Sequence, residues 1–181
     1  MLRVRVGYCG GVKENPSYYD LVDHTEAVSI DFDPEVISFE EMLKHFWDAH
    51  EPTRNNASRQ YIHALFYRSE LQKIAAEKSL IATALERSIP EGKIETEIIP
   101  VREFTYAEDY HQKYYLTQYR EIREFLTKIY PDEKALADST VATRLNAYLF
   151  SGLDKTRARL EEEIDSCGLP DGYRDQILAR V

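Results

Sequence analysis

The chain has 181 residues, a length that favours one domain or one domain with an appendage. Its 23 Lys and Arg residues against 32 Asp and Glu residues give a formal charge of −9, which argues against nonspecific nucleic-acid binding. A hydrophobic content of 43% excludes a disordered chain, and no apolar run approaches the roughly 20 residues of a membrane span. Two cysteines cannot make a disulfide framework, so we expect a reducing compartment, the cytoplasm.

Alternating apolar residues predict two strands at the start of the chain. The first begins at residue 2 and places Leu2, Val4 and Val6 on one face. It runs into Gly7-Tyr8-Cys9-Gly10-Gly11, which we expect to be a glycine-rich turn. The second strand covers about residues 26–32.

Capping signals predict two helices in the middle of the chain. Ser38 and Glu41 match the capping box, so a helix should begin at residue 39 and end before Pro52. Ser69 is expected to cap a longer helix that ends near residue 88. Its apolar residues recur at helical spacing and should be buried: Leu71, Ile74, Ala75, Ile81, Leu85 and Ile89.

Two further strands are expected, one over residues 61–67 and one over residues 93–101, and in the second of them apolar residues alternate again. Strands interleaved with helices favour an α/β or α+β packing of helices on one sheet. After residue 106 the pattern changes, because residues 107–181 show no convincing strand and at least three helical patterns. We therefore expect a first domain over residues 1–115 and a helical extension over residues 116–181.

Hydroxylated rings and one carboxylate are the first candidates for chemistry. Thirteen tyrosines outnumber seven phenylalanines, and Tyr18 and Tyr61 are among those in or beside expected turns, where hydroxyls can converge. His24 and Glu26 are two residues apart at a strand start and should point to one face. A buried glutamate among tyrosines could donate a proton near neutral pH. From the residues alone, a solvated carboxylate beside half-buried core tyrosines is the simpler interpretation.

The thiols and a histidine spacing are weaker candidates. Cys9 lies in a glycine-flanked turn whose N–H groups can stabilise a thiolate, whereas Cys167 lies at an acidic helix end. Both are more readily explained as inert buried thiols. Glu108 and His111 form a single Glu-x-x-His spacing on an expected helix over residues 106–115, and one copy does not predict a metal site. We predict no metal.

Several short motifs occur in a fixed order between residues 4 and 115. They are Gly7-Tyr8-Cys9-Gly10-Gly11, Asn15-Pro16-Ser17-Tyr18, His24-Thr25-Glu26-Ala27-Val28, Phe32-Asp33-Pro34, Ile37-Ser38-Phe39-Glu40-Glu41, Phe46-Trp47, His50-Glu51-Pro52-Thr53, Gln60-Tyr61 and Tyr106-Ala107-Glu108-Asp109-Tyr110-His111-Gln112. The ordered set resembles the peptide methionine sulfoxide reductase A family. The resemblance implies an α+β fold with a split βαβ-like sheet. It also implies an oxidoreductase, a peptide-methionine (S)-S-oxide reductase, that repairs oxidised methionine in proteins or in free form.

The resemblance also implies roles for individual residues. In the family a thiolate attacks the sulfoxide sulfur, while a glutamate and two tyrosine hydroxyls hold and protonate the oxygen. These positions correspond to Glu26, Tyr18 and Tyr61. No cofactor is implied, because a thiol reductant such as thioredoxin supplies the electrons.

The family nucleophile lies in a Gly-Cys-Phe-Trp-Gly motif upstream of the Gly7 turn, and this sequence starts too late to contain it. We therefore expect the fold to lack its first strand and first helix. Three interpretations follow: an N-terminally shortened reductase, a non-catalytic relative that binds methionine or methionine sulfoxide peptides, or a reductase in which Cys9 has taken over as nucleophile. The expected partners are oxidised methionine and a thioredoxin-like reductant, without nucleic acid or membrane. Self-association is expected from the apolar surface of an incomplete domain.

Overall fold

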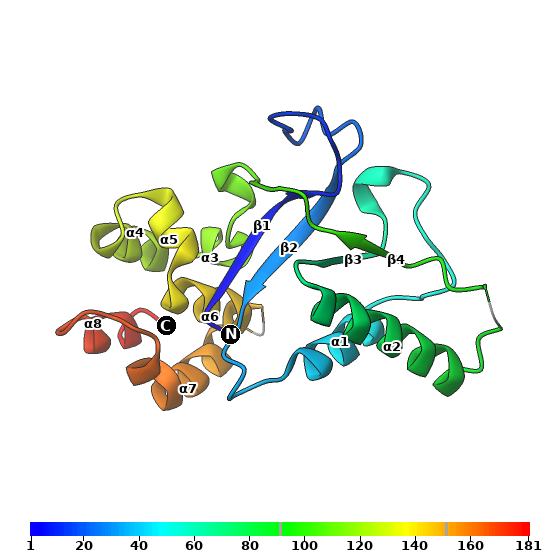
Figure 1. Ribbon diagram of the computed structural model, residues 1–181. Coiled ribbons are helices and arrows are strands. Elements are labelled where there is room, and N and C mark those ends of the chain that lie inside the picture. Colours follow the sequence, from blue (N-terminus) through cyan, green and yellow to red (C-terminus); the bar gives the residue numbers. More distant parts are fainter. Residues whose placement is uncertain (91, 151) are drawn as a thin grey trace. The chain divides into compact units, whose positions relative to one another are not determined.

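A computed structural model describes residues 1–90, 92–150 and 152–181 (Figure 1). Within these residues the strands form a three-stranded sheet in the order β2-β1-β5 and a two-stranded sheet of β3 and β4. The strands are β1 (Arg3–Cys9), β2 (Thr25–Asp31), β3 (Ala64–Tyr67), β4 (Glu97–Pro100) and β5 (Phe104–Tyr106). Small sheets combined with separate helices confirm the predicted α+β class.

The helices of the described residues fall mostly in the second half of the chain. They are α1 (Phe39–Asp48), α2 (Glu70–Glu86), α3 (Tyr114–Thr117), α4 (Arg120–Ile129), α5 (Glu133–Asp138), α6 (Thr140–Leu149), α7 (Leu153–Glu163) and α8 (Arg174–Leu178). Short 3-10 turns lie at Arg59–Tyr61, Asp109–His111 and Ile164–Ser166. No helix in the described part of the chain is both long and apolar enough to cross a membrane.

The chain divides into two compact units. One contains residues 1–6, 28–32 and 107–181, and we call it the helical unit; the other contains residues 7–27 and 33–106, and we call it the sheet unit. Strands β1 and β2 each contribute residues to both units. The predicted boundary between residues 115 and 116 stays a prediction.

In the sheet unit, β1 pairs antiparallel with β5, so that Gly7 lies opposite Tyr106 and Cys9 lies opposite Phe104. The predicted turn at Gly7–Cys9 is therefore wrong, because the strand continues to Cys9 and the chain turns only at Gly10, whose φ is +88°. Gly7 serves close packing instead. A Cβ on this residue would lie 2.3 Å from the carbonyl oxygen of Thr105, a separation that no side chain tolerates.

Helix α1 begins where the capping box predicts. The Ser38 hydroxyl accepts the N–H of Glu41, and the Glu41 carboxylate accepts the N–H of Ser38 at 2.9 Å. The helix buries Leu43 and Trp47, and the Trp47 indole N–H donates to the Ser79 hydroxyl of α2 at 2.8 Å. The local signal and the tertiary packing therefore agree for this helix.

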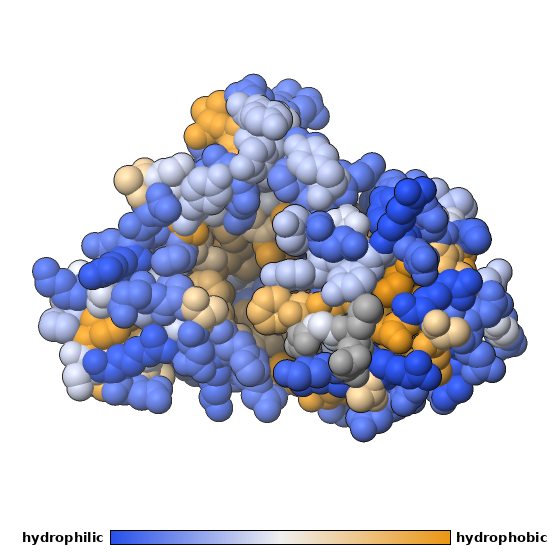
Figure 2. All heavy atoms as spheres, turned by 180° about the vertical axis from the view of Figure 1, so that it is seen from behind, coloured by the Kyte–Doolittle hydropathy of each residue, from blue (hydrophilic) through white to orange (hydrophobic). Residues whose placement is uncertain are grey.

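Helix α2 connects the parallel strands β3 and β4 and packs on both (Figure 1). Ser69 caps it as predicted, but the predicted buried stripe is wrong, since Leu71 is 81% exposed and Leu85 is 77% exposed. The helix buries Ala76 and Thr83 instead, because these small side chains allow close packing. On the face drawn in Figure 2, hydrophobic residues reach the surface in patches among mostly hydrophilic ones.

The two strands of this pair are shorter than predicted. The expected strand over residues 61–67 begins only at Ala64, because the N–H of Tyr61 donates to the Ser58 carbonyl at 3.0 Å and closes a 3-10 turn. The expected strand over residues 93–101 is β4, Glu97–Pro100. Tyr61 therefore projects from a turn before the sheet, not from a strand within it.

The helical unit has one apolar core, and the described residues 107–181 contain no strand, as predicted. The core comprises Leu116, Ile122, Phe125, Leu126, Leu136, Val141, Ala142, Leu145, Leu149, Leu160, Ile164, Cys167 and Ile177. These residues come from α3, α4, α5, α6, α7, α8 and the turns between them. The helices therefore stabilise one another by burying a shared apolar interior.

Candidate functional site

The sheet unit brings together three predicted residues, which we call the Tyr18–Glu26–Tyr61 cluster. The phenol of Tyr61 is hydrogen-bonded to that of Tyr18, and Glu26 lies close enough for its charge to act on Tyr61. The hydrogen bond, then desolvation and then the charge of Glu26 raise the pKa of Tyr61 to about 12. Tyr61 therefore keeps its proton at neutral pH, and with 46% of its surface exposed it is accessible.

Tyr18 is held by a tight turn. The chain takes a left-handed conformation at Asn15, with a φ of +50°, and Asp20 then donates its N–H to the Ser17 carbonyl at 2.9 Å. The rings of Tyr18 and Tyr19 meet edge to face, with centroids 5.2 Å apart. The turn therefore fixes the backbone beside Tyr18, whose phenol is hydrogen-bonded to Tyr61 in the 3-10 turn.

The Tyr18–Tyr61 hydrogen bond leads to a testable prediction. In Tyr18→Phe the pKa of Tyr61 should fall from about 12 toward the ordinary value of 10, because the hydrogen bond that favours the protonated phenol is lost. The 13Cζ resonance of Tyr61, assigned with Tyr61→Phe, should then begin to move by pH 10. The control is Tyr19→Phe, which alters a neighbouring ring that is 89% exposed; in this variant the Tyr61 resonance should not move by pH 10. Identical titrations in Tyr18→Phe and the unmodified protein would exclude the bond.

Glu26 is hydrogen-bonded to Gln60, a residue that the sequence did not predict as part of the site. The side-chain amide of Gln60 donates from Nε2 to Oε1 of Glu26 at 2.7 Å. Gln60 and Tyr61 are consecutive in the 3-10 turn Arg59–Tyr61, so one turn supplies both a phenol and an amide to the cluster. The only sequence signal for Gln60 is its place directly before Tyr61.

His24, expected beside Glu26, supports a loop. Its ring is 3% exposed, and Nε2 donates to the Lys13 carbonyl at 2.9 Å. The carboxylate of Asp23 accepts the N–H groups of Val12 and Lys13, which lower the pKa of Asp23. A Cβ on Gly11 would lie 2.4 Å from the His24 ring, so glycine is required there. These contacts make His24 a residue that shapes the loop before Tyr18.

Both thiols are buried, with exposures of 1% each. Cys9 Sγ donates to the Glu103 carbonyl at 3.2 Å, and burial raises the pKa of this thiol. Burial also raises the pKa of Cys167, whose Sγ lies 3.6 Å from Nη1 of Arg144. Neither environment favours a thiolate at neutral pH. A nucleophilic role for Cys9 stays a prediction.

The residues after β5 do not form the helix expected over residues 106–115. They form a 3-10 turn over Asp109–His111, and α3 begins only at Tyr114, because Lys113 takes a left-handed φ of +51°. The His111 ring lies 3.8 Å from the Glu108 carboxylate. In the described part of the chain, no group of three or more His, Cys, Asp or Glu residues could hold a metal ion.

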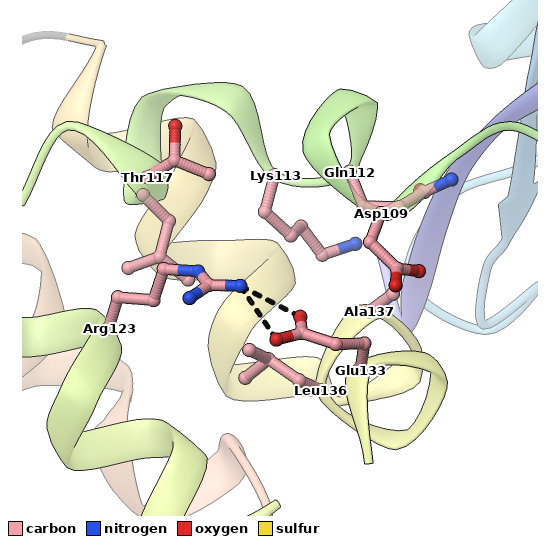
Figure 3. A pocket seen from close by; sticks show the side chains of 9 residues that line it. Asp109, Gln112, Lys113, Thr117, Arg123, Glu133, Leu136 and Ala137 are labelled. Carbon is pink, nitrogen blue, oxygen red and sulfur yellow. Dashed lines mark hydrogen bonds and ion pairs between the residues drawn. The ribbon is translucent and has the colours of Figure 1, made fainter. Parts of the chain in front are cut away.

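The helical unit contains a small polar pocket of about 10 Å³, close to the space of one water molecule. Figure 3 shows Lys113 pointing into it, beside the pair in which Arg123 donates to both carboxylate oxygens of Glu133 at 2.8 Å. Lys113 is 7% exposed and its ammonium donates to the Val4 carbonyl. Burial, reinforced by the charge of Arg5, lowers the pKa of Lys113 to about 8.

This shift predicts how stability depends on pH. Because the pKa of Lys113 is lowered from 10.5 to about 8, the unfolded chain binds the proton more tightly, and stability rises between these two pH values. Lys113→Met lacks this titrating group and does not gain that stability. As the pH rises over this range, its free energy of unfolding should therefore fall by up to about 3 kcal/mol relative to that of the unmodified protein. Urea titrations at pH 7, 9 and 10.5 measure it, with Lys128→Met as an exposed control; a difference independent of pH would contradict the prediction.

The chain was compared with protein families and with individual proteins. The model of the family described as peptide methionine sulfoxide reductase matches residues 1–144. A peptide methionine sulfoxide reductase of Drosophila melanogaster is 41% identical over 164 residues, covering 89% of this chain and 65% of the relative. The peptide methionine sulfoxide reductase MsrA of Rippkaea orientalis is 42% identical over 120 residues, covering 60% of this chain and 55% of the relative.

Two solved structures extend the similarity to the fold. Methionine sulfoxide reductase A of Corynebacterium diphtheriae superposes with a TM-score of 0.57 at 30% identity, covering 63% of this chain and 62% of that one. Reduced Mxr1 from Saccharomyces cerevisiae superposes with a TM-score of 0.56 at 28% identity, covering 61% of this chain and 68% of that one. The chain spans 65% of the length of the Drosophila melanogaster relative and 55% of that of the Rippkaea orientalis relative. Because the family model matches 144 of its 181 residues, the chain belongs to the peptide methionine sulfoxide reductase family.

Proposed function

We propose that the Tyr18–Glu26–Tyr61 cluster binds the oxygen of methionine (S)-sulfoxide, in a protein that reduces this group to methionine and so repairs oxidised proteins. The observation that carries the proposal is the phenol pair of Tyr18 and Tyr61 beside the carboxyl group of Glu26. A sulfoxide oxygen is a strong acceptor, and two phenols and a protonated carboxyl group are donors. The aromatic rings also offer apolar surface to the methyl group.

The chemistry that this geometry supports begins at the oxygen. As Glu26 transfers its proton to the sulfoxide oxygen, the sulfur becomes more electrophilic and a thiolate can attack it. Methionine leaves as the thioether, and the thiol is oxidised to a sulfenic acid. A second thiol condenses with the sulfenic acid to give a disulfide and water, and a thioredoxin-like dithiol then reduces the disulfide.

A second candidate function is binding without turnover. The observation that favours it is the state of Cys9 and Cys167, which are buried thiols with raised pKa values. A protein of this kind would hold methionine sulfoxide peptides through the Tyr18–Glu26–Tyr61 cluster and leave the sulfur untouched. Both thiols are free, in keeping with the predicted reducing cytoplasm.

One experiment tests both functions. The chain is mixed with N-acetyl-methionine-(S)-sulfoxide amide, with and without dithiothreitol, while calorimetry measures binding and chromatography measures the thioether formed. Thioether formed from the S epimer and not from the R epimer supports the reductase, and its loss in Cys9→Ser would assign the nucleophile. Binding without thioether supports the second function. The absence of both binding and product would exclude both.

Exposed apolar side chains support self-association, which we propose. A groove of about 840 Å³ between α1 and α2 is lined by the apolar residues Leu43, Trp47, Leu71 and Ile74 together with charged side chains. Leu71 is 81% exposed, and exposed apolar side chains gathered in one groove favour association in water. Sedimentation velocity should show a species heavier than 21.1 kDa whose fraction grows with concentration, and a monomer at every concentration would contradict the proposal.

A further inference from the structure

We infer that Gln60 is a positioning residue, which fixes the oxygen of Glu26 that carries the proton for the sulfoxide. This inference rests on the proposed function of the Tyr18–Glu26–Tyr61 cluster. Its direct observation is the 2.7 Å hydrogen bond from Nε2 of Gln60 to Oε1 of Glu26. A side-chain amide nitrogen only donates, so the oxygen that it contacts must act as an acceptor.

The contact distinguishes the two oxygens of the carboxyl group. When Glu26 is protonated, one oxygen carries the hydrogen and the other has only lone pairs. The Gln60 amide occupies Oε1, so the proton resides on Oε2, and the carboxyl group presents a donor in one direction. When the O–H bond of Oε2 breaks and the proton passes to the sulfoxide oxygen, the Gln60 N–H stabilises the carboxylate that remains.

Gln60 can hold this position because its turn is fixed to two strands. The Thr25 hydroxyl, 1% exposed on β2, donates to the Arg59 carbonyl at 3.0 Å. Nη1 of Arg59 donates to both carboxylate oxygens of Glu97 on β4, at 2.7 and 2.9 Å. Both bonds are made by Arg59, the residue directly before Gln60; the first connects the turn to β2, which carries Glu26, and the second connects it to β4. The amide therefore meets the carboxylate with little conformational freedom left to lose.

The test uses Gln60→Leu, which removes the amide at similar volume, and Gln118→Leu, an exposed glutamine in the helical unit, as the matched control. Calorimetry measures the binding of N-acetyl-methionine-(S)-sulfoxide amide by each protein. In Gln60→Leu, affinity should be about 3- to 10-fold weaker than in the unmodified protein and in Gln118→Leu, because the carboxyl group is no longer oriented.

A double substitution separates positioning from general structural damage. If Gln60 acts through Glu26, Gln60→Leu should weaken binding clearly in the unmodified background and little further in a Glu26→Ala background. A purely structural role would weaken binding equally in both backgrounds. An unchanged affinity in Gln60→Leu, or equal losses in the two backgrounds, would overturn the inference alone. No sulfoxide binding by the unmodified protein would overturn the proposed function and the inference with it.

A second measurement does not depend on whether Gln60→Leu folds. The side-chain amide protons of Gln60 should have different chemical shifts in 1H–15N spectra of the unmodified chain and of Glu26→Ala, because the substitution removes the oxygen to which Nε2 donates. Gln60 side-chain signals at the same position in both proteins would overturn the inference.

Discussion

Replacing Glu26 by Gln is expected to lower kcat/KM for methionine (S)-sulfoxide by roughly 10²–10⁴-fold, the range typical of a lost general acid. The substitution keeps the shape of the side chain and its contact with Gln60 but removes the transferable carboxyl proton. Without that proton, the sulfoxide oxygen must leave with less charge compensation and the sulfur is a poorer electrophile. Steady-state rates with dithiothreitol as reductant measure the effect.

The matched control is Glu35→Gln, the same chemical change at an exposed position in the sheet unit, which should leave kcat/KM within about twofold. Rates for Glu26→Gln within twofold of the unmodified protein would rule out Glu26 as the acid. If the chain binds sulfoxide without turnover, Glu26→Ala should weaken binding by about tenfold, because a hydrogen bond from the carboxyl group to the substrate is lost.

The second large effect is expected in the core of the helical unit. Leu145→Ala should lower the free energy of unfolding by about 3–5 kcal/mol, since it removes a fully buried side chain and leaves a cavity that helices cannot easily close. The loss is a large share of the 5–15 kcal/mol that typically stabilises a domain. Urea denaturation followed by circular dichroism at 222 nm would measure it, because this unit holds most of the helices.

The control for this change is Val28→Ala, which truncates a side chain that is 59% exposed in the same unit. It should change the free energy of unfolding by no more than about 0.5 kcal/mol. Equal effects of Leu145→Ala and Val28→Ala would mean that the helices do not share one cooperative core. A large effect confined to Leu145→Ala would support the core as described.

Local signals could be read from the sequence where neighbouring residues decide the outcome. The Ser38 and Glu41 pair specifies the start of α1 because both hydrogen bonds form within four residues of the chain. Ser69 specifies the start of α2 in the same way, with its hydroxyl accepting the N–H of Gln72 at 3.3 Å. The absence of strand patterns after residue 106 likewise matched the helices of the described residues.

Sequence patterns predict burial and secondary structure wrongly where the outcome depends on residues that are distant in the sequence. The spacing of Leu71 and Leu85 predicted burial, but burial depends on which elements lie against a helix, and α2 turns its small residues inward. The density of glycines predicts a turn at Gly7, whereas Gly7 lies in β1 and permits the close approach of β5. The predicted strand includes Tyr61, whereas a hydrogen bond to the Ser58 carbonyl places this residue in a 3-10 turn before β3.

For the candidate site, the sequence by itself determined the residue types: the ordered motifs singled out Tyr18, Glu26 and Tyr61 and placed the chain in its family. Only the tertiary structure decided that these residues meet, and that Gln60 binds one oxygen of Glu26. The tertiary structure also decided the state of the candidate thiol, because the raised pKa of Cys9 comes from its burial. The physical reason is that these hydrogen bonds join residues 34 to 94 positions apart in the sequence, so the bonds and the accompanying desolvation arise only when separate segments pack together.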